Sequence, residues 1–420
     1  MFLNMDIFNK QNYHFIGIGG IGISAIARML LLQGKNVSGS DSSQSEITDD
    51  LEKLGAKIFI GQKAENITDE AEVVIYTVAA TEENPERLEA RKREGEEKIT
   101  CVSYPQALGE LSKNMYTIAI SGTHGKTTTT AMTGHILKKA GLDPTVIVGS
   151  KMLSDEDKGG GNFMAGKSKY LVVEACEYKR SFLNLYPTIL VITNIDADHL
   201  DYYKDLDDIK SAFAELKNKV PEDGFVITDK EYSQIEIIEP LSVPGEHNIL
   251  NAKAAIRVAE ILGIEQSKSL EYLKDFKGTW RRLEYKGEKD GNIFYDDYAH
   301  HPSEITASLS ALKEKYPDRK LVAVFEAHQQ SRTRLLFDDF VSALQIADQV
   351  FIAPIFITRE IDDGETTNEK LANAVNIQKP AGAVSNAGEL KIELEKIAPP
   401  LCVVLMGAGN IYKWTPVLLS

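Results

Sequence analysis

The chain has 420 residues, too many for one ordinary hydrophobic core, so two or three domains are expected. Its 47 Lys and Arg against 62 Asp and Glu give a net charge of −15, which disfavours general nucleic-acid binding. Cys101, Cys176 and Cys402 form no CxxC pair and no metal-ligand spacing, which is typical of a reducing compartment. No basic region followed by an apolar run opens the sequence, and the apolar stretch 15–32 contains glycines and Arg28. We therefore expect a cytoplasmic protein with no membrane segment and no nucleic-acid partner.

Apolar runs alternate with amphipathic runs along the chain, a pattern typical of α/β proteins with parallel sheets. In a first unit, residues 1–110, we expect strands at 13–18, 36–40 and 73–77, and helices from the glycine turn to about 33 and at 84–97. In a second unit, 111–288, we expect strands at 116–121, 170–175, 188–193 and 224–228, and helices at 127–140 and 248–262. In a third unit, 289–420, we expect strands at 293–296, 321–326, 349–353 and 402–406. The order of elements predicts three α/β domains.

The first glycine-rich turn follows the first predicted strand and fits G-x-G-x-x-G, with Gly17, Gly19, Gly20 and Gly22 ahead of a helix. Glycines at such a turn let the backbone approach a pyrophosphate that binds at the helix N-terminus. Asp41 ends the next predicted strand, where an acidic side chain can bind a ribose hydroxyl. Alone, the motif fits an NAD-dependent dehydrogenase, a protein that binds a nucleotide-sugar such as a UDP-sugar, or a purely structural glycine turn.

The second glycine-rich turn, residues 121–127, has the sequence Ser-Gly-Thr-His-Gly-Lys-Thr between a strand and a helix. Backbone N–H groups of such a loop cradle phosphates, with Lys126 on the β- and γ-phosphates and the Thr127 hydroxyl on Mg²⁺. Ile120 stands where the first glycine of the full G-x-x-x-x-G-K-[ST] pattern would be, so the shorter pattern is less specific. The strand–loop–helix setting favours a P-loop, and a dehydrogenase has no use for one.

Polar side chains after later strands are candidates for the same site. Glu174 ends a hydrophobic strand and is placed for Mg²⁺, with a solvated strand end as the alternative. His199 follows the next strand; because Mg²⁺ prefers oxygen ligands, its local sequence favours a capping or packing histidine. Asn248 and Asn251 lie three apart at a helix start and fit contact with an adenine edge, with Asn248 as a plain N-cap an equal alternative.

The third unit carries basic and imidazole side chains near predicted strand ends. An arginine of the pair Arg281-Arg282, at a domain junction, can reach a γ-phosphate and neutralise charge that develops there. His300 and His301 precede a helix and point in different directions, so at most one of them meets a given ligand. Arg332 follows another strand and can bind a carboxylate through two hydrogen bonds.

Together these segments resemble the Mur ligase family over nearly the whole chain. The resemblance is carried, in order, by GIGGIG, SGTHGKTTTT, VVEACEY, TNIDADHLD, GEHNILN, WRRLE, YDDYAHHP, AHQQSRTR and MGAGN. An ordered set of this kind is far more specific than any single member. It implies a Rossmann-like N-terminal domain (1–110) that binds a UDP-sugar, a central P-loop ATPase domain (111–288) and a Rossmann-like C-terminal domain (289–420) that binds the amino acid.

The resemblance also implies roles for individual residues. ATP phosphates would be held by Gly122, Thr123, His124, Gly125, Lys126, Thr127 and Thr128. Mg²⁺ would be held by Thr127, Glu174 and His199, the adenine side by Asn248 and Asn251, and the rest of the nucleotide site by Arg282 and Asp297. The UDP-sugar would contact Gly17, Gly19, Gly20, Gly22 and Asp41, and the amino acid and reacting groups would contact Tyr298, His300 and Arg332. Catalysis would rest on Lys126, His199, Arg282 and His300.

The activity that the resemblance implies is ATP- and Mg²⁺-dependent amide formation between UDP-N-acetylmuramate and L-alanine through an acyl phosphate, by a monomer or homodimer. The GIGG and AHQQSRTR segments favour a ligase that adds one amino acid over a relative that attaches an intact peptide. L-Serine and glycine are alternatives to L-alanine. Gln329 stands where some members have arginine, so one carboxylate contact is lost or replaced.

Overall fold

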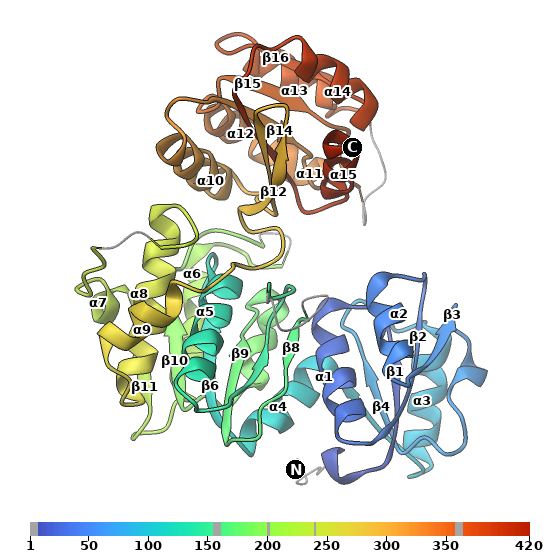
Figure 1. The fold of residues 1–420 in the computed structure, drawn as a ribbon. Helices are drawn as coiled ribbons and strands as arrows, with labels where there is room; N and C mark the ends of the chain where they lie inside the picture. Colours follow the sequence, from blue (N-terminus) through green and yellow to red (C-terminus); the bar gives the residue numbers. More distant parts are fainter. Residues whose placement is uncertain (1–6, 154–160, 200–201, 239–240, 358–363) are drawn as a thin grey trace. The chain divides into compact units, whose positions relative to one another are not determined.

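The computed structural model describes residues 7–153, 161–199, 202–238, 241–357 and 364–420. The chain forms two compact units, of which unit 1 comprises Met1–Glu236 with Asn251–Asp275 and unit 2 comprises Ile237–Leu250 with Phe276–Ser420. Unit 1 holds two of the three sheets and unit 2 holds the third (Figure 1). No helix in the described ranges is long and apolar enough to cross a membrane.

The first sheet of unit 1 is parallel throughout, with strand order β3-β2-β1-β4-β5. Its strands are β1 (Asn12–Ile16), β2 (Asn36–Asp41), β3 (Lys57–Ile60), β4 (Val73–Tyr76) and β5 (Thr100–Ser103), and its helices are η1 (Ile7–Asn9), α1 (Ile21–Leu32), α2 (Glu46–Lys53), η2 (Ala64–Asn66), α3 (Pro85–Gly95) and α4 (Tyr104–Lys113). Tyr13 and Phe15 on one face of β1, and His14 and Ile16 on the other, are all at most 2% exposed. Burial of both faces is expected because helices cover both sides of a parallel sheet.

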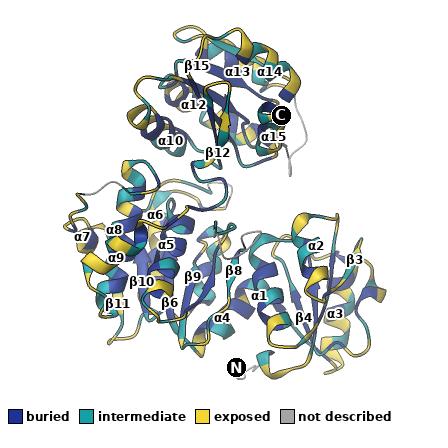
Figure 2. Ribbon diagram, viewed as in Figure 1, coloured by how far each residue is buried: buried dark blue, intermediate teal, exposed yellow. Residues whose placement is uncertain are grey.

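The second sheet of unit 1 has the order β11-β10-β6-β9-β7-β8 and is parallel except for β8. Its strands are β6 (Tyr116–Ser121), β7 (Thr145–Ile147), β8 (Phe163–Met164), β9 (Tyr170–Glu174), β10 (Ile189–Ile192) and β11 (Phe225–Ile227), and its helices are α5 (Lys126–Lys139), η3 (Tyr178–Asn184), α6 (Leu206–Lys217), α7 (Asp229–Tyr232), α8 (Glu246–Ile261) and α9 (Gln266–Leu273). β6, the central strand that leads into the predicted P-loop, is buried from Thr117 to Ser121. Figure 2 shows these strands as a buried layer with exposed residues on the outer helices.

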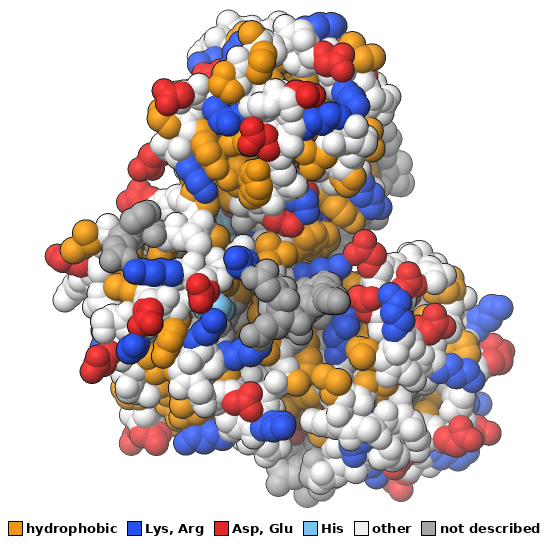
Figure 3. Space-filling model, in the orientation of Figure 1, with side chains coloured by type: hydrophobic (Ala, Val, Ile, Leu, Met, Phe, Trp, Pro, Cys, Tyr) orange, Lys and Arg blue, Asp and Glu red, His pale blue; other side chains and the backbone are white. Residues whose placement is uncertain are grey.

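The sheet of unit 2 has the order β12-β13-β17-β14-β15-β16 and is parallel except for β12, which pairs antiparallel with β13. Its strands are β12 (Glu284–Lys289), β13 (Asn292–Asp297), β14 (Lys320–Phe325), β15 (Gln349–Ile352), β16 (Ala381–Ala383) and β17 (Leu401–Met406), and its helices are α10 (Pro302–Lys315), α11 (Gln330–Leu335), α12 (Phe337–Leu344), α13 (Asn368–Val375), α14 (Ala387–Glu395), η4 (Ile411–Trp414) and α15 (Thr415–Leu419). Figure 3 shows that Lys and Arg side chains are interspersed with Asp and Glu side chains on the visible face of each unit.

The predicted α/β class is confirmed, and each predicted strand and helix is present within a few residues. Six strands of the structure were not predicted from the sequence: β3, β5, β7, β8, β12 and β16. The helix α8 begins at Glu246, two residues before the predicted start. Gly245, with φ +100°, precedes it, and its carbonyl accepts the Asn248 N–H at 3.0 Å. Asn248 therefore lies in the first turn, and its interpretation as the N-cap is wrong.

Candidate active site

The loop between β6 and α5 in unit 1 is held by hydrogen bonds and has two positions where only glycine fits. Gly122 has φ +131°, and a Cβ there would lie 2.0 Å from Oγ1 of Thr193. Gly125 has φ +82°, and a Cβ there would lie 2.3 Å from Oδ1 of Asn251. The His124 N–H donates to Oδ1 of Asn194 at 2.9 Å, and the Thr193 hydroxyl donates to the His124 carbonyl at 2.6 Å. The loop is thereby held with its backbone at the N-terminus of α5, where anions bind.

Lys126, the first residue of α5, makes three hydrogen bonds through its ammonium group. Nζ donates to the carbonyls of Gly122 at 2.7 Å and Thr123 at 2.9 Å, and to Oε1 of Glu177 at 3.1 Å. Burial alone would lower the pKa of Lys126, but the Glu177 carboxylate beside it raises that pKa overall. The lysine is therefore charged, as the binding of phosphates requires, and is held by its own loop and by Glu177.

Two oxygen groups that suit Mg²⁺ lie side by side next to this loop. The Thr127 hydroxyl donates to Oε1 of Glu174 at 3.1 Å, and the Gly149 N–H donates to Oε2 at 2.7 Å. Neighbouring ligands of an octahedral Mg²⁺ at about 2.1 Å are about 3 Å apart, so the hydroxyl and the carboxylate fit one ion. His199, the third residue of the predicted set, instead has Nε2 3.4 Å from Oε1 of Glu177. In the parts of the chain that the structure describes, no group of three or more His, Cys, Asp or Glu side chains is arranged to hold a metal.

The residues predicted to lie on the adenine side are on α8, but their contacts differ. Oδ1 of Asn251 accepts the Thr129 hydroxyl at 3.2 Å and lies against the Gly125 backbone. Asn251 therefore supports the phosphate loop directly. In unit 2, Nδ2 of Asn248 donates to the Pro244 carbonyl at 2.6 Å, which anchors the segment that enters α8.

The first glycine-rich turn joins β1 to α1, as predicted, and its glycines have separate structural roles. Gly17 has φ +77°, and a Cβ there would lie 2.5 Å from the Thr77 side chain. The Gly19 N–H donates to Oδ2 of Asp41 at 2.9 Å, so Asp41 shapes the turn. Gly22, in the first turn of α1, faces the Tyr104 ring, which a Cβ would approach to 2.9 Å. The first turn of α1 contains no acidic residue, which leaves its N–H groups suited to an anion.

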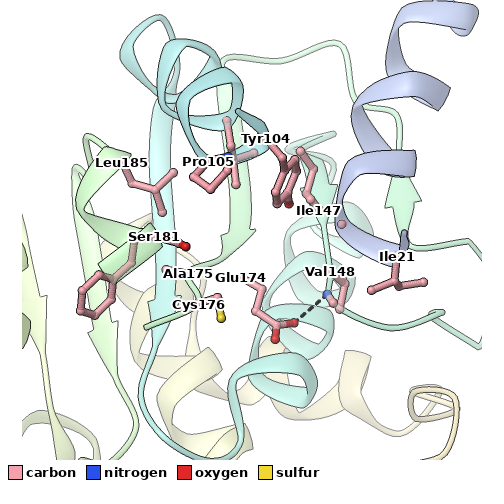
Figure 4. A pocket seen from close by; sticks show the side chains of 14 residues that line it. Ile21, Tyr104, Pro105, Ile147, Val148, Glu174, Ala175, Cys176, Ser181 and Leu185 are labelled. Carbon is pink, nitrogen blue, oxygen red and sulfur yellow. Dashed lines mark hydrogen bonds between the residues drawn. The ribbon is translucent and has the colours of Figure 1, made fainter. Parts of the chain in front are cut away.

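A largely apolar pocket of about 220 Å³ lies between this turn and the second sheet of unit 1 (Figure 4). Ile21 on α1 and Tyr104 on α4 line it beside the first sheet, and Val148 after β7 and Cys176 after β9 line it beside the second. Glu174 also lines the pocket, and its carboxylate accepts the Thr127 hydroxyl. The pocket therefore connects the first turn of α1 with the candidate magnesium site.

In unit 2, the predicted residues Arg282, Tyr298 and His300 gather around Glu304, which the sequence analysis missed. Nη1 of Arg282 lies 3.6 Å from Oε1 of Glu304, and Nδ1 of His300 lies 3.2 Å from Oε2. The Arg282 guanidinium lies over the Tyr298 ring at 5.1 Å from its centroid. His301 points elsewhere and caps α10, accepting the Ser303 N–H at 3.4 Å, so the predicted divergence of the two histidines is confirmed.

Asp297, at the end of β13, is buried and is used as a structural acceptor. Its Oδ1 accepts the Ala299 N–H at 2.8 Å, and its Oδ2 accepts the Ser308 hydroxyl at 2.7 Å and the Leu283 N–H at 3.3 Å. Burial raises the pKa of this carboxyl, although these hydrogen bonds oppose the shift. Arg332 lies half-buried on α11, after β14, as predicted.

Comparisons with known proteins identify the family of this chain. Three family profiles match: the Mur ligase family catalytic domain over residues 12–116, the Mur ligase middle domain over 120–239, and the Mur ligase glutamate ligase domain over 281–409. A UDP-N-acetylmuramate–L-alanine ligase of Clostridium acetobutylicum is 40% identical, with 100% of each chain covered. The chain belongs to the Mur ligase family.

Other Mur ligases agree with this assignment. A UDP-N-acetylmuramate–L-alanine ligase of Clostridium kluyveri is 41% identical over 89% of this chain and 90% of its own. The crystal structure of the UDP-N-acetylmuramate–alanine ligase MurC of Thermotoga maritima superposes with a TM-score of 0.79 at 29% identity, covering 97% of this chain and 98% of that one. A murein peptide ligase of Psychrobacter arcticus shares the fold with a TM-score of 0.69 at 23% identity, over 98% of both chains.

Two residues at the candidate site of this Mur ligase were missed by sequence reasoning. Glu177 lies three residues after Glu174, and only the turn after β9 shows that it reaches Lys126. Glu304 lies in the first turn of α10, where an acidic residue is expected to stabilise the helix N-terminus. The signal that could have identified both is an acidic residue three or four positions after a predicted site residue.

Proposed function

We propose that this Mur ligase forms an amide bond between the carboxylate of UDP-N-acetylmuramate and L-alanine, with ATP as the energy source. The observation that carries the proposal is 40% identity over the whole chain to a ligase of that name, in a protein whose phosphate loop presents Lys126 beside Thr127 and Glu174. In the proposed reaction, the substrate carboxylate attacks the γ-phosphorus of ATP, and ADP leaves. The amine then attacks the resulting acyl phosphate, and inorganic phosphate leaves.

Unit 1 would supply the groups that stabilise phosphoryl transfer. The Lys126 ammonium and the backbone N–H groups at the N-terminus of α5 would neutralise charge on the transferred phosphoryl oxygens. Thr127 and Glu174 would hold Mg²⁺, with His199 as a further ligand, and this ion would neutralise the β- and γ-phosphate charge. Asn251 would keep the loop in its binding conformation from behind.

The sugar nucleotide and the amino acid would bind to other parts of the chain. The diphosphate would lie at the first turn of α1, whose backbone N–H groups have no acidic residue of that turn beside them. In unit 2, Arg332 would bind the carboxylate of the amino acid. An amine attacks only when it is neutral, and His300 would take its proton, with Glu304 stabilising the imidazolium that forms.

The test is phosphate release from Mg-ATP in the presence of UDP-N-acetylmuramate, with single amino acids and the tripeptide L-Ala-D-Glu-diaminopimelate supplied in turn. Release that requires both the sugar nucleotide and L-alanine supports the proposal. Release with the tripeptide alone would assign the chain to peptide attachment, and no release with any pair would refute a ligase function.

Two lysine variants make the test specific for the phosphate loop. Lys126→Ala is expected to lower turnover by about 1000-fold, because it removes a charge that stabilises the transition state. Lys139→Ala is the control, since Lys139 ends the same helix and pairs with Asp275 on the surface. Near-normal turnover by a folded Lys126→Ala protein would contradict the assignment.

A further inference from the structure

Glu177 is a buried acid at the centre of the candidate site, and it lies outside the sets of residues proposed above to bind phosphate or magnesium. The residue is 2% exposed and comes three positions after the end of β9. Its Oε2 lies 2.9 Å from Nζ of Lys126, and its Oε1 lies 3.1 Å from the same nitrogen and 3.4 Å from Nε2 of His199. One carboxylate therefore contacts both Lys126, which is proposed to bind the phosphates, and His199, which is proposed as a further magnesium ligand.

All three donors of the Lys126 ammonium are used by the protein itself. Two go to the loop carbonyls of Gly122 and Thr123, and the third goes to Glu177. A lysine has no further donor, so contact with a nucleotide phosphate requires that one of the three bonds be given up.

The Glu177 contact is the one that a phosphate can replace. The two carbonyls belong to a loop that Thr193 and Asn194 hold through the His124 backbone, so they are harder to displace than a side chain. The Glu177 carboxylate is instead a side-chain anion, and a phosphate oxygen offers the ammonium the same kind of bond. Oε1 of Glu177 also keeps a second partner, His199, after the lysine leaves.

Hydrogen bonds hold the backbone around Glu177 in place. When a phosphate replaces Glu177 as the partner of Lys126, only side chains therefore need to move. The Glu177 carbonyl accepts hydrogen bonds from the Tyr203 hydroxyl and from the Arg180 N–H, the latter at 2.9 Å. The Tyr178 ring packs against His199, with 4.8 Å between centroids, which holds the imidazole beside the carboxylate.

We propose that Glu177 is a positioning residue that holds the Lys126 ammonium in the nucleotide-free site, releases it to the nucleotide phosphates, and keeps His199 in place throughout. This inference rests on the proposed function for its effect on turnover. Its effect on nucleotide binding does not, because binding requires neither the sugar nucleotide nor the amino acid.

The proposal predicts opposite effects on binding and turnover. In Glu177→Gln, a negative charge next to the phosphate site is removed and the lysine is released, so Mg²⁺-free ADP should bind roughly 10-fold more tightly. Turnover should nevertheless fall by about 10-fold or more, because His199 loses the carboxylate that keeps it in place and tighter ground-state binding does not help the transition state. A merely structural role for Glu177 would weaken both.

The experiment is isothermal titration of Glu177→Gln with ADP in EDTA, together with its turnover in the phosphate-release assay. Glu215→Gln is the control, because it removes the same charge from an exposed pair with Arg180 in the same unit. Tighter ADP binding with lower turnover in Glu177→Gln, and neither change in Glu215→Gln, is the expected result. Weaker ADP binding or unchanged turnover in a folded Glu177→Gln protein would overturn the proposal.

A crystal structure of the wild-type protein with ADP tests the same exchange if Glu177→Gln does not fold. Lys126 Nζ is expected within about 3.2 Å of a phosphate oxygen and out of contact with Glu177, while Glu177 still contacts His199. Lys126 still on Glu177, with a loop carbonyl released instead, would overturn the proposal. Absence of phosphate release by the wild type would refute the proposed function and leave the binding result standing.

Discussion

Gly125→Ala should weaken nucleotide binding far more than it weakens the fold, and a second glycine at the other end of the same helix provides the comparison. Gly125 precedes α5 with φ +82°, and Gly141 comes after the C-cap of α5 with φ +80°. Their backbone conformations are nearly the same, but their surroundings are not. A Cβ at Gly125 would lie 2.3 Å from Oδ1 of Asn251, whereas a Cβ at Gly141 would meet no atom within 4 Å.

The expected magnitudes are set by these two contacts. A left-handed conformation costs an alanine about 1–2 kcal/mol, so both variants should lose about that much stability to unfolding. Only Gly125→Ala adds a close contact, and overpacking of this kind costs about 1–3 kcal/mol. The contact can be relieved only by displacing the loop or the Asn251 amide, and nucleotide binding requires the undisplaced loop. The cost therefore falls on binding and corresponds to about 5- to 150-fold weaker affinity.

The assay is isothermal titration of both variants with Mg-ADP, with urea unfolding to measure the stability of each. Gly125→Ala should show weaker binding by the stated factor, and Gly141→Ala should bind like the wild type with a similar loss of stability. Wild-type affinity in both variants would refute the argument that Asn251 fixes the phosphate loop through Gly125. An equal loss of affinity in both would show that the backbone strain alone, rather than the contact, is responsible.

Three further predictions test other contacts. Burial opposes ionisation of Glu86, but its hydrogen bonds lower the pKa of this carboxyl below 4.5. The carboxylate therefore stabilises the fold above about pH 4.5, and its contribution disappears as pH falls through the folded pKa. Urea unfolding should show Glu86→Gln less stable by about 1–3 kcal/mol at pH 7, with a difference that shrinks below pH 4.5. Asn251→Ala removes the acceptor of the Thr129 hydroxyl and should raise the KM for ATP by about 10-fold, since one buried hydrogen bond is worth about 1 kcal/mol and loop support is lost as well; an unchanged KM would contradict this. Asp297→Asn replaces one of the two oxygens that accept from Ser308 and the backbone, so calorimetry should show a Tm lower by about 2–6 °C.

The fold was largely predictable from the sequence where strands are long and apolar. β6 and β17, for example, were predicted to within one residue, because β17 is a continuous apolar run and β6 has an apolar centre, Ile-Ala-Ile, directly ahead of a glycine-rich turn. β7, β8 and β16 have three, two and three residues, which is too few to show any periodicity. β12 was missed for another reason: its sequence Glu-Tyr-Lys-Gly-Glu-Lys is polar because it is an edge strand.

The candidate site was predictable in its motifs but not in its side-chain pairs. The sequence identified Glu174 because a carboxylate at the end of a parallel strand faces the ligand-binding edge of the sheet. The spacing from Glu174 marks Glu177 as a candidate, but it does not show that the side chain turns back to Lys126, because the direction of a side chain in a turn depends on φ and ψ values that residue types do not specify. His199 illustrates the same limit, since its φ of +55° is unusual for a non-glycine residue and determines where the ring points.

The two glycine-rich turns show why a glycine pattern indicates a tight turn before it indicates a ligand. In the first, Gly22 is required by the Tyr104 ring, and in the second, Gly125 is required by the Asn251 amide. At both positions a neighbouring side chain already requires glycine, whether or not a phosphate binds there. The turns differ in the first residue of the helix that each one enters, because α1 begins with Ile21 and offers an anion only backbone N–H groups, whereas α5 begins with Lys126. The first turn is therefore suited to a bound diphosphate that stays intact, and the second to a phosphoryl group whose charge changes during transfer.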